Sequence, residues 1–168
     1  AVRVGSADVP ASDAVVTLQG KKVFASRNAN GVFVNGIKVK TADVEASNGI
    51  IHIIENVLIP PTQTIQQIAA GNPNLSLLVA AVTKAGLLNA IGGDAKFTVF
   101  APTNAAFNAA GFNTAEDINA APTSLITTVV SYHVLGTNAF ASDLINGATV
   151  PTLQGGTLTI GTTPPSVK

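Results

Sequence analysis

The stretch Thr17-Leu18-Gln19-Gly20 recurs as Thr152-Leu153-Gln154-Gly155, and this recurrence decides how the 168-residue chain is divided. Asp143 follows Asp8 by the same interval as Thr152 follows Thr17, and we call this spacing the repeat interval. This repeat interval, the distance along the chain from Thr17 to Thr152, has the length of a whole domain and is too long for a solenoid repeat. Residues 1–33 are therefore expected to be the counterpart of 136–168, with the chain beginning within one domain and ending within the next.

The composition excludes several classes of function. Charged residues make up only 11% of the chain and balance at nine of each sign, so the clustered basic surface that a nucleic acid needs is not expected. The chain has no cysteine, which excludes a disulfide framework and a thiolate site. The longest apolar helical region, residues 75–91, is interrupted by polar residues, so no transmembrane segment is predicted. A neutral surface of this kind is expected to be adhesive, because little charge repulsion keeps copies apart.

Residues 1–60 carry strand patterns. Two alternating runs flank Asn35-Gly36, which is the strongest hairpin signal in the chain because both central residues of a type I′ turn need positive φ. Residues 14–18 and 22–26 are also expected to be strands, and residues 41–46 a polar turn or a single helical turn. The run 50–54 (Ile-Ile-His-Ile-Ile) predicts a central strand that is covered on both faces.

From Thr62 the apolar period changes from two residues to about 3.6, which indicates helices. Asn74 is expected to cap one helix and Thr103 another, and Pro122 is expected in the first turn of a helix that leads into Tyr132-His133. Other segments are given by position: helices at 65–71 and 104–110, strands at 97–100 and 149–160, a polar bend at 92–94 and a loop at 162–168. Strands followed by helices and then strands, without regular alternation, predict an α+β fold with segregated layers.

Three stretches together resemble the fasciclin-like (FAS1) family. Residues 97–107 (Phe-Thr-Val-Phe-Ala-Pro-Thr-Asn-Ala-Ala-Phe) are similar to its first signature block, Tyr132-His133 to its tyrosine-histidine pair, and residues 47–60 (Ser-Asn-Gly-Ile-Ile-His-Ile-Ile-Glu-Asn-Val-Leu-Ile-Pro) to its second block. The Thr-Leu-Gln-Gly motif and the Val-Asn-Gly hairpin also fit, so the resemblance covers nearly the whole chain. One departure is Asn104, where the family often carries Asp. The resemblance implies a FAS1-like β-sheet wedge with a segregated helical layer.

The order of the blocks determines the expected domains. In the family the second block comes last, whereas here it comes first, so the resemblance implies that residues 1–60 are the C-terminal part of one domain and residues 62–168 the N-terminal part of the next. The chain is then a window on a tandem array, a closed permuted domain, or a subunit whose halves pair between copies into an open filament. We favour an array or polymer, and expect that the two parts do not form one self-contained core and that their partners lie in other copies.

Catalysis is not expected. His52 and His133 are the two candidate bases near neutral pH, and neither has metal-ligand spacing or a neighbouring Cys. Ser131 precedes His133 by two residues, but no Gly-x-Ser-x-Gly turn accompanies it. His52 in a central strand and His133 at a helix end are therefore interpreted as hydrogen-bonded core residues, and no cofactor or metal is expected. A small apolar ligand is a third, weaker hypothesis, because the sequence offers no polar anchor for it.

The resemblance implies an extracellular or cell-surface adhesion or matrix module. In matrix members of the family, an Asp followed by Ile or Val upstream of the second block and the region around the tyrosine-histidine pair are assigned to receptor binding. The matching positions are Asp43-Val44 and Tyr132-His133, although Asp43 could simply cap a turn and Tyr132 simply fill the core. The expected partners are other copies, neighbouring FAS1 domains, a cell-surface receptor or a matrix component. Asn74-Leu-Ser76 is a glycosylation sequon that has meaning only in a eukaryotic secretory host.

Overall fold

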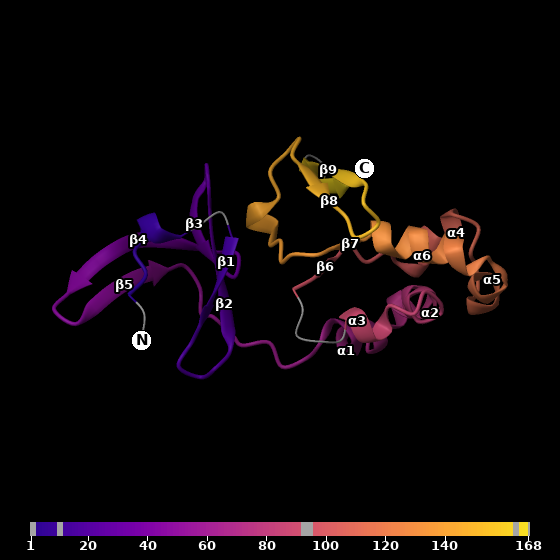
Figure 1. Cartoon of the computed structure of the whole chain (residues 1–168), viewed down its shortest axis with the longest axis horizontal. Coiled ribbons are helices and arrows are strands. Elements are labelled where there is room, and N and C mark those ends of the chain that lie inside the picture. Colours follow the sequence, from indigo (N-terminus) through magenta and orange to yellow (C-terminus); the bar gives the residue numbers. More distant parts are fainter. Residues whose placement is uncertain (1–2, 10–11, 92–95, 163–164, 168) are drawn as a thin grey trace. The chain divides into compact units, whose positions relative to one another are not determined.

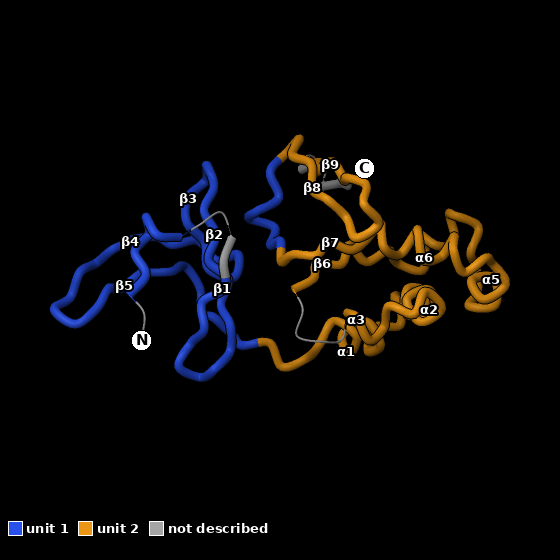
Figure 2. The backbone as a smooth tube through the Cα atoms, in the orientation of Figure 1, with its two compact units in different colours: residues 1–60, 139–145 blue, residues 61–138, 146–168 orange. Residues whose placement is uncertain are grey.

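The computed structural model of the chain describes residues 3–9, 12–91, 96–162 and 165–167. The chain divides into two compact units, each with its own contacts (Figures 1 and 2). The first contains Ala1–Pro60 and Ala139–Ile145, and the second contains Pro61–Asn138 and Asn146–Lys168. In this division residues 139–145 join the first unit, although the chain on both sides of them belongs to the second. The predicted bend at 92–94 lies outside the described residues.

The first unit is a five-stranded antiparallel sheet whose strands follow one another in chain order. The turn between β3 and β4 contains Asn35 (φ 48°) and Gly36 (φ 78°), the two residues at which the sequence predicts a hairpin. Asn35 also ties this turn to β2, because its Oδ1 accepts a hydrogen bond from Phe24 N at 2.8 Å. The strands are β1 (Ser12–Val16), β2 (Lys22–Asn28), β3 (Gly31–Val34), β4 (Ile37–Ala46) and β5 (Gly49–Ile54), and the unit also holds the 3₁₀ turns η1 (Ser6–Asp8) and η3 (Ala141–Asp143).

Two expectations for this sheet are wrong. Residues 50–54 form β5 at the edge of the sheet and not at its centre, and Ile51 and Ile53 are 56% and 48% exposed. Residues 41–46 form part of β4 and not a turn, because β4 continues past two register shifts to pair with β5. A β-bulge lets a strand with irregular alternation continue in the ladder, which residue patterns alone do not reveal.

The second unit packs helices around an apolar core. Its centre is formed by α2, α5 and α6, where Ile118 and Ile126 are 0% and 1% exposed. Lys84 Nζ at the end of α2 donates to the carbonyl oxygens of Asn119 and Ala121, which closes the C-terminal end of α5 against α2. The helices are α1 (Ile65–Ala70), η2 (Pro73–Leu75), α2 (Ser76–Lys84), α3 (Leu88–Ile91), α4 (Asn104–Ala109), α5 (Ala115–Ala120) and α6 (Thr123–Tyr132).

Side-chain caps determine where several of these helices begin. Thr103 Oγ1 accepts from Ala106 N at 3.4 Å at the start of α4, and Thr64 and Gln67 form a capping box at the start of α1. Asn74 does not cap α2 as expected; it lies inside η2, which Asn72 caps, and α2 begins at Ser76. Pro73 fixes φ for this extra 3₁₀ turn and so delays the start of α2.

The second unit also contains two small antiparallel sheets. One pairs β6 (Thr98–Val99) with β7 (Val134–Leu135), and the other has the order β10 (Pro165–Val167), β9 (Thr157–Thr162), β8 (Thr149–Pro151). The expected loop at 162–168 is wrong in part, because 165–167 form β10. Helices and antiparallel strands in one chain confirm the predicted α+β class.

The sequence repeat is also a repeat of local structure. The strand pairs have the same register at the repeat interval: Val15 pairs with Val23 in β1 and β2, and Val150 pairs with Leu158 in β8 and β9. The turns agree as well, because Gly20 and Gly155 both have positive φ, at 83° and 99°. The two copies of the motif therefore build the same hairpin, once in each unit.

Candidate adhesion surface

Asp43 lies in the first unit at an irregularity of β4. It falls within the second register shift of the β4–β5 ladder, between Thr41 and Val44, and adopts φ 58°, a left-handed conformation that Asp tolerates better than most residues. Its Oδ1 accepts from Ser6 N at 2.7 Å, and its Oδ2 accepts from Ser6 Oγ. The hydroxyl of Ser6, followed by its backbone N–H, holds the pKa of Asp43 below its ordinary value of 3.8. The charge of Asp43 is thus already used to fix the N-terminal segment at Ser6, the first residue of η1.

His52 on β5 fixes the same segment from the other strand. Its Nδ1 accepts from Asp43 N at 3.3 Å, so the proton on Nε2 is placed to donate to Val4 O, 2.8 Å away. Arg3 and Glu45 add an exposed ion pair of 3.1 Å. His52 is half-buried and hydrogen-bonded, but it is on an edge strand and not in the core.

Val44 presents an apolar side chain next to Asp43. It is 38% exposed and lies directly opposite Ile51, which is 56% exposed, in the β4–β5 ladder. Directly opposed residues of an antiparallel pair have their side chains on the same face. The hairpin therefore offers an exposed apolar pair, Val44 and Ile51, beside a carboxylate that is internally bonded.

Tyr132 and His133 end α6 in the second unit, so the two candidate pairs belong to different units. Tyr132 Oη donates to Thr157 O at 2.9 Å, and a Cβ at Gly156 would lie 3.1 Å from Tyr132 Cε2. The His133 ring meets that of Tyr132 edge to face, and His133 Nδ1 lies 2.8 Å from Val129 O. Both rings are half-buried. Tyr132 therefore holds the second copy of the repeated turn against the end of α6, and His133 packs against Tyr132.

The arrangement around these residues offers no catalytic geometry. Ser131 Oγ donates to Thr127 O at 2.6 Å and to Thr128 O at 3.2 Å, back along α6. Within the described ranges, no three His, Cys, Asp or Glu side chains gather as metal ligands. No helix in that part of the chain is both long and apolar enough to span a membrane.

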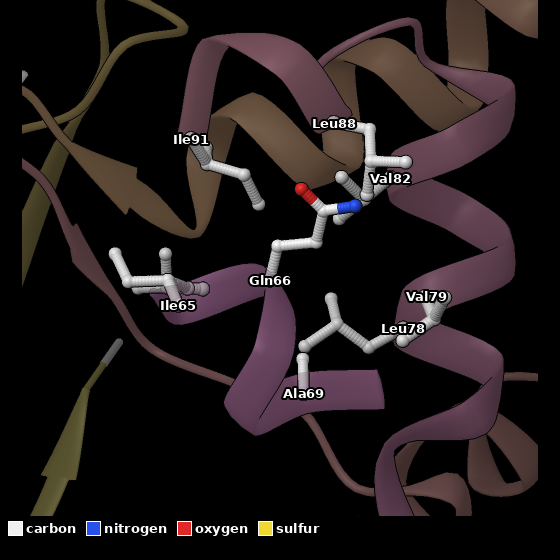
Figure 3. A pocket seen from close by; sticks show the side chains of 9 residues that line it. Ile65, Gln66, Ala69, Leu78, Val79, Val82, Leu88 and Ile91 are labelled. Carbon is white, nitrogen blue, oxygen red and sulfur yellow. The ribbon is translucent and has the colours of Figure 1, made fainter. Parts of the chain in front are cut away.

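An apolar pocket lies in the second unit between α1, α2 and α3 (Figure 3). Its cavity volume is about 20 Å³, roughly the space of one water molecule, and Gln66 is the one polar side chain among its lining residues. The amide of Gln66 lies toward Leu88 and Val82 (Figure 3). The lining residues are Ile65, Gln66, Ala69, Leu78, Val79, Val82, Leu88, Ile91 and Val99. With a single amide as anchor, the pocket does not define a ligand.

Two side-chain contacts in the structure, one made by Ser6 and one by Ser26, were not predictable from residue patterns. Ser6, the partner of Asp43, lies 37 positions away in the chain, and its only signal is that it precedes Asp8 in the repeated segment. Ser26, a buried serine on β2 whose hydroxyl donates to Asp143, belongs to no motif in the sequence. A buried hydroxyl requires a partner, but the sequence does not say which.

Comparison with known proteins gives concordant results. The family model described as "Fasciclin domain" matches residues 1–60 and 73–168. The chain is 33% identical over 140 residues to human periostin and 34% identical over 144 residues to the transforming growth factor-beta-induced protein ig-h3 of Sus scrofa. These matches cover 83% and 85% of this chain but 17% and 21% of the relatives, so the chain spans about a fifth of their length.

A solved structure shares the fold. It is a FAS1 domain pair from the insect cell adhesion molecule fasciclin I, with a TM-score of 0.50 and 18% identity. The match covers 89% of this chain and 53% of the other.

Proposed function

The chain belongs to the fasciclin domain family, and on that premise we propose that it is an adhesion or matrix module that acts by protein–protein recognition without catalysis. Its family relationship places it outside the cell or at the cell surface. The observation that carries the proposal is the exposed apolar pair Val44 and Ile51 on the β4–β5 hairpin. Exposed apolar side chains on a weakly charged surface favour contact with another protein.

The proposed contact uses Val44 more than Asp43. The carboxylate of Asp43 already accepts one hydrogen bond from Ser6 on each oxygen, so a receptor or matrix partner would share a carboxylate that is held by the chain itself. Asp43 instead positions Val44 by anchoring the bulge in β4. Tyr132 acts in the same indirect way, by holding the turn from Thr152 to Gly156, and His133 supports the Tyr132 ring.

The test is adhesion of cells or matrix extract to the immobilised chain. We expect Val44→Ser with Ile51→Ser to reduce binding at least about tenfold, because the contact surface loses its apolar side chains. Leu18→Ser is the matched control, since Leu18 is fully exposed elsewhere in the same unit. Equal binding by the wild type and the Val44/Ile51 variant would remove this surface from the proposal.

We also propose that residues 1–60 and 62–168 are complementary parts of two consecutive domains. The support is the repeat: the same turn, the same strand register and the same positive φ recur at the repeat interval. A longer natural chain containing further copies at this interval, detected by intact mass and peptide mapping, is the expected result. A natural product with one copy of each part would argue for a permuted domain instead.

A second candidate function is a subunit of an extracellular filament, in which parts of different copies complete one another. It is favoured by the free edge of β5, which among the described strands pairs with β4 alone and exposes Ile51 and Ile53. An uncovered apolar edge strand is a template for another strand. Light scattering across a concentration series should then show growing species that Ile53→Lys suppresses; a monodisperse monomer at all concentrations would exclude the filament.

A further inference from the structure

The segment Ala139–Ile145 belongs to the first unit although the chain on both sides of it belongs to the second. Figure 2 shows this segment in the colour of the first unit, between two stretches in the colour of the second. The chain thus enters the first unit once more after residue 138 and leaves it again at residue 146. What holds the segment there is a set of specific contacts with β2.

The polar contacts join η3 to one face of β2. Ser26 Oγ donates to Asp143 Oδ1 at 2.6 Å, and Asn28 Nδ2 donates to Ser142 O at 2.7 Å. Ser26 is only 4% exposed, so Asp143 satisfies a buried hydroxyl that would otherwise lack a partner for its proton. Positions 26 and 28 lie on the same face of the strand because side chains alternate along it.

An aromatic contact extends the same row. Phe24 is two residues before Ser26 on β2, and its ring lies against Phe140 with centroids 6.2 Å apart and an interplanar angle of 46°. Gly36 leaves room for that ring, since a Cβ there would approach Phe140 Cβ to 3.1 Å. The receiving surface, which we call the β2 dock, consists of Phe24, Ser26, Asn28 and Gly36.

The docked turn is held in shape by its own bonds. Phe140 N donates to Asp143 Oδ2 at 2.9 Å, and Asp143 N donates to Phe140 O at 2.8 Å. This leaves Asp143 Oδ1 for Ser26, so one carboxylate both closes the turn and contacts the dock. The turn is therefore preorganised for binding, which reduces the conformational entropy lost on docking.

The repeat supplies a natural comparison. Gly5 N donates to Asp8 Oδ2 at 3.0 Å and Asp8 N donates to Gly5 O at 3.0 Å, so η1 has the same closed turn one repeat interval earlier. It carries Gly5 where the second copy carries Phe140, and it is bonded to Asp43 through Ser6. The turn closed by Asp is thus common to both copies, while the aromatic ring belongs to the docked copy.

We propose that Phe140–Asp143 is a recognition latch, by which the chain between residues 138 and 146 is held on β2 within the first unit of the same molecule. The β2 dock selects an aromatic-x-x-Asp turn: Phe24 and Gly36 accept the ring, Ser26 takes the carboxylate and Asn28 takes the carbonyl before it. The latch is independent of the adhesion surface proposed above, because it shares no residue with that surface.

The absence of cysteine from the chain allows a direct test by cross-linking of the full-length protein. We expect Asn28→Cys with Ser142→Cys to oxidise to an intrachain disulfide, seen as a monomer on non-reducing electrophoresis and as a linked peptide pair by mass spectrometry. The matched control is Asn28→Cys with Ala7→Cys, since Ala7 is the counterpart of Ser142 in the first copy. Free thiols in the test pair, disulfides only between chains, or equal oxidation of both pairs would overturn the latch.

A second measurement separates recognition from folding. Phe140→Ala is expected to speed hydrogen exchange of peptides covering residues 22–28 at least about fivefold, while exchange in α6 stays unchanged. Asp143→Asn should act in the same direction, and Asp8→Asn, which alters the matching turn in η1, should leave residues 22–28 unaffected. Unchanged exchange at 22–28 in both Phe140→Ala and Asp143→Asn would contradict the proposal, and the cross-link decides the matter if either variant fails to fold.

Discussion

Thr17 and Thr152 make the same hydrogen bond one repeat interval apart, since each Oγ1 donates to the carbonyl oxygen four residues ahead, at 2.8 Å to Lys21 and 3.0 Å to Gly156. Their backbone N–H groups donate to the same oxygens at 2.8 and 2.9 Å. The surroundings differ, because Thr152 is buried and Thr17 is partly exposed. The same turn is therefore expected to contribute differently to stability at its two positions in the chain.

This difference predicts unequal costs for the same substitution. Thr152→Val removes the hydroxyl of a buried residue, leaves the oxygen of Gly156 with one partner fewer, and should lower the free energy of unfolding by about 1–2 kcal/mol. Thr17→Val should cost less than about 0.5 kcal/mol, because water can replace the lost bond. Denaturant unfolding of the two single variants measures both values. Equal decreases in the free energy of unfolding would show that burial does not control how much the threonine hydroxyl contributes to stability.

The helical core gives a second prediction. Ile126→Ala should destabilise the second unit by about 2–5 kcal/mol, because its side chain is fully buried between α6 and α2 and leaves a cavity. Leu125→Ala is the matched control on the same helix, since Leu125 is 47% exposed, and it should cost less than about 1 kcal/mol. Thermal unfolding followed by circular dichroism compares the two, and a smaller effect at Ile126 than at Leu125 would contradict this core.

Local signals in the sequence determine the parts of the fold that depend on neighbouring residues. The hairpin follows from Asn35-Gly36 because positive φ is a property of those two residues, and Thr103 lies before a helix because its hydroxyl can accept an N–H three residues later. The repeat, read from a few identical residues, also recurs as structure. These features require no knowledge of the rest of the chain.

Long-range features could not be read in the same way. An apolar run such as 50–54 indicates a strand but not whether that strand has one neighbour or two, so its place at the sheet edge was not predictable. The contact between Ser26 and Asp143 spans 117 positions and has no motif on β2. The bond from Ser6 to Asp43 is equally non-local, which is why the sequence could name Asp43 as a candidate but not reveal that its carboxylate is occupied.

Gly36 supplies a third prediction through its two constraints. It has φ 78°, and an added Cβ would meet Phe140 Cβ at 3.1 Å. Gly20 has a similar φ of 83° but open space around it. In both Gly→Ala variants, backbone strain should lower the free energy of unfolding by about 1–2 kcal/mol. The decrease should be larger for Gly36→Ala, because this change also disturbs the aromatic contact.

Combining Gly36→Ala with Phe140→Ala tests that explanation. If the extra loss at Gly36 comes from the ring, the double variant should cost less than the sum of the single variants, as residues in contact are not additive. Chemical denaturation of the four proteins provides the cycle. Full additivity would show that the ring of Phe140 does not restrict position 36.

The acid response of Asp43 supplies the last prediction. The Ser6 hydroxyl and then its backbone N–H lower the pKa of Asp43 below the ordinary 3.8. Because the folded-state pKa is depressed, the stabilising contribution of this carboxylate is fully present above the unfolded-state pKa and is lost as pH falls through the folded value. The contribution should therefore disappear only below about pH 3.8.

Ser6→Ala tests the cause of this depression, because it removes the hydroxyl and should raise the pKa of Asp43 toward 3.8. Asp117 is an internal control, since the backbone N–H groups of Asn113 and Thr114 lower its pKa and the substitution does not touch them. Carboxyl carbon chemical shifts followed by NMR during an acid titration report both groups. An unchanged Asp43 midpoint in Ser6→Ala would mean that the Ser6 hydroxyl does not bond to Asp43 in solution.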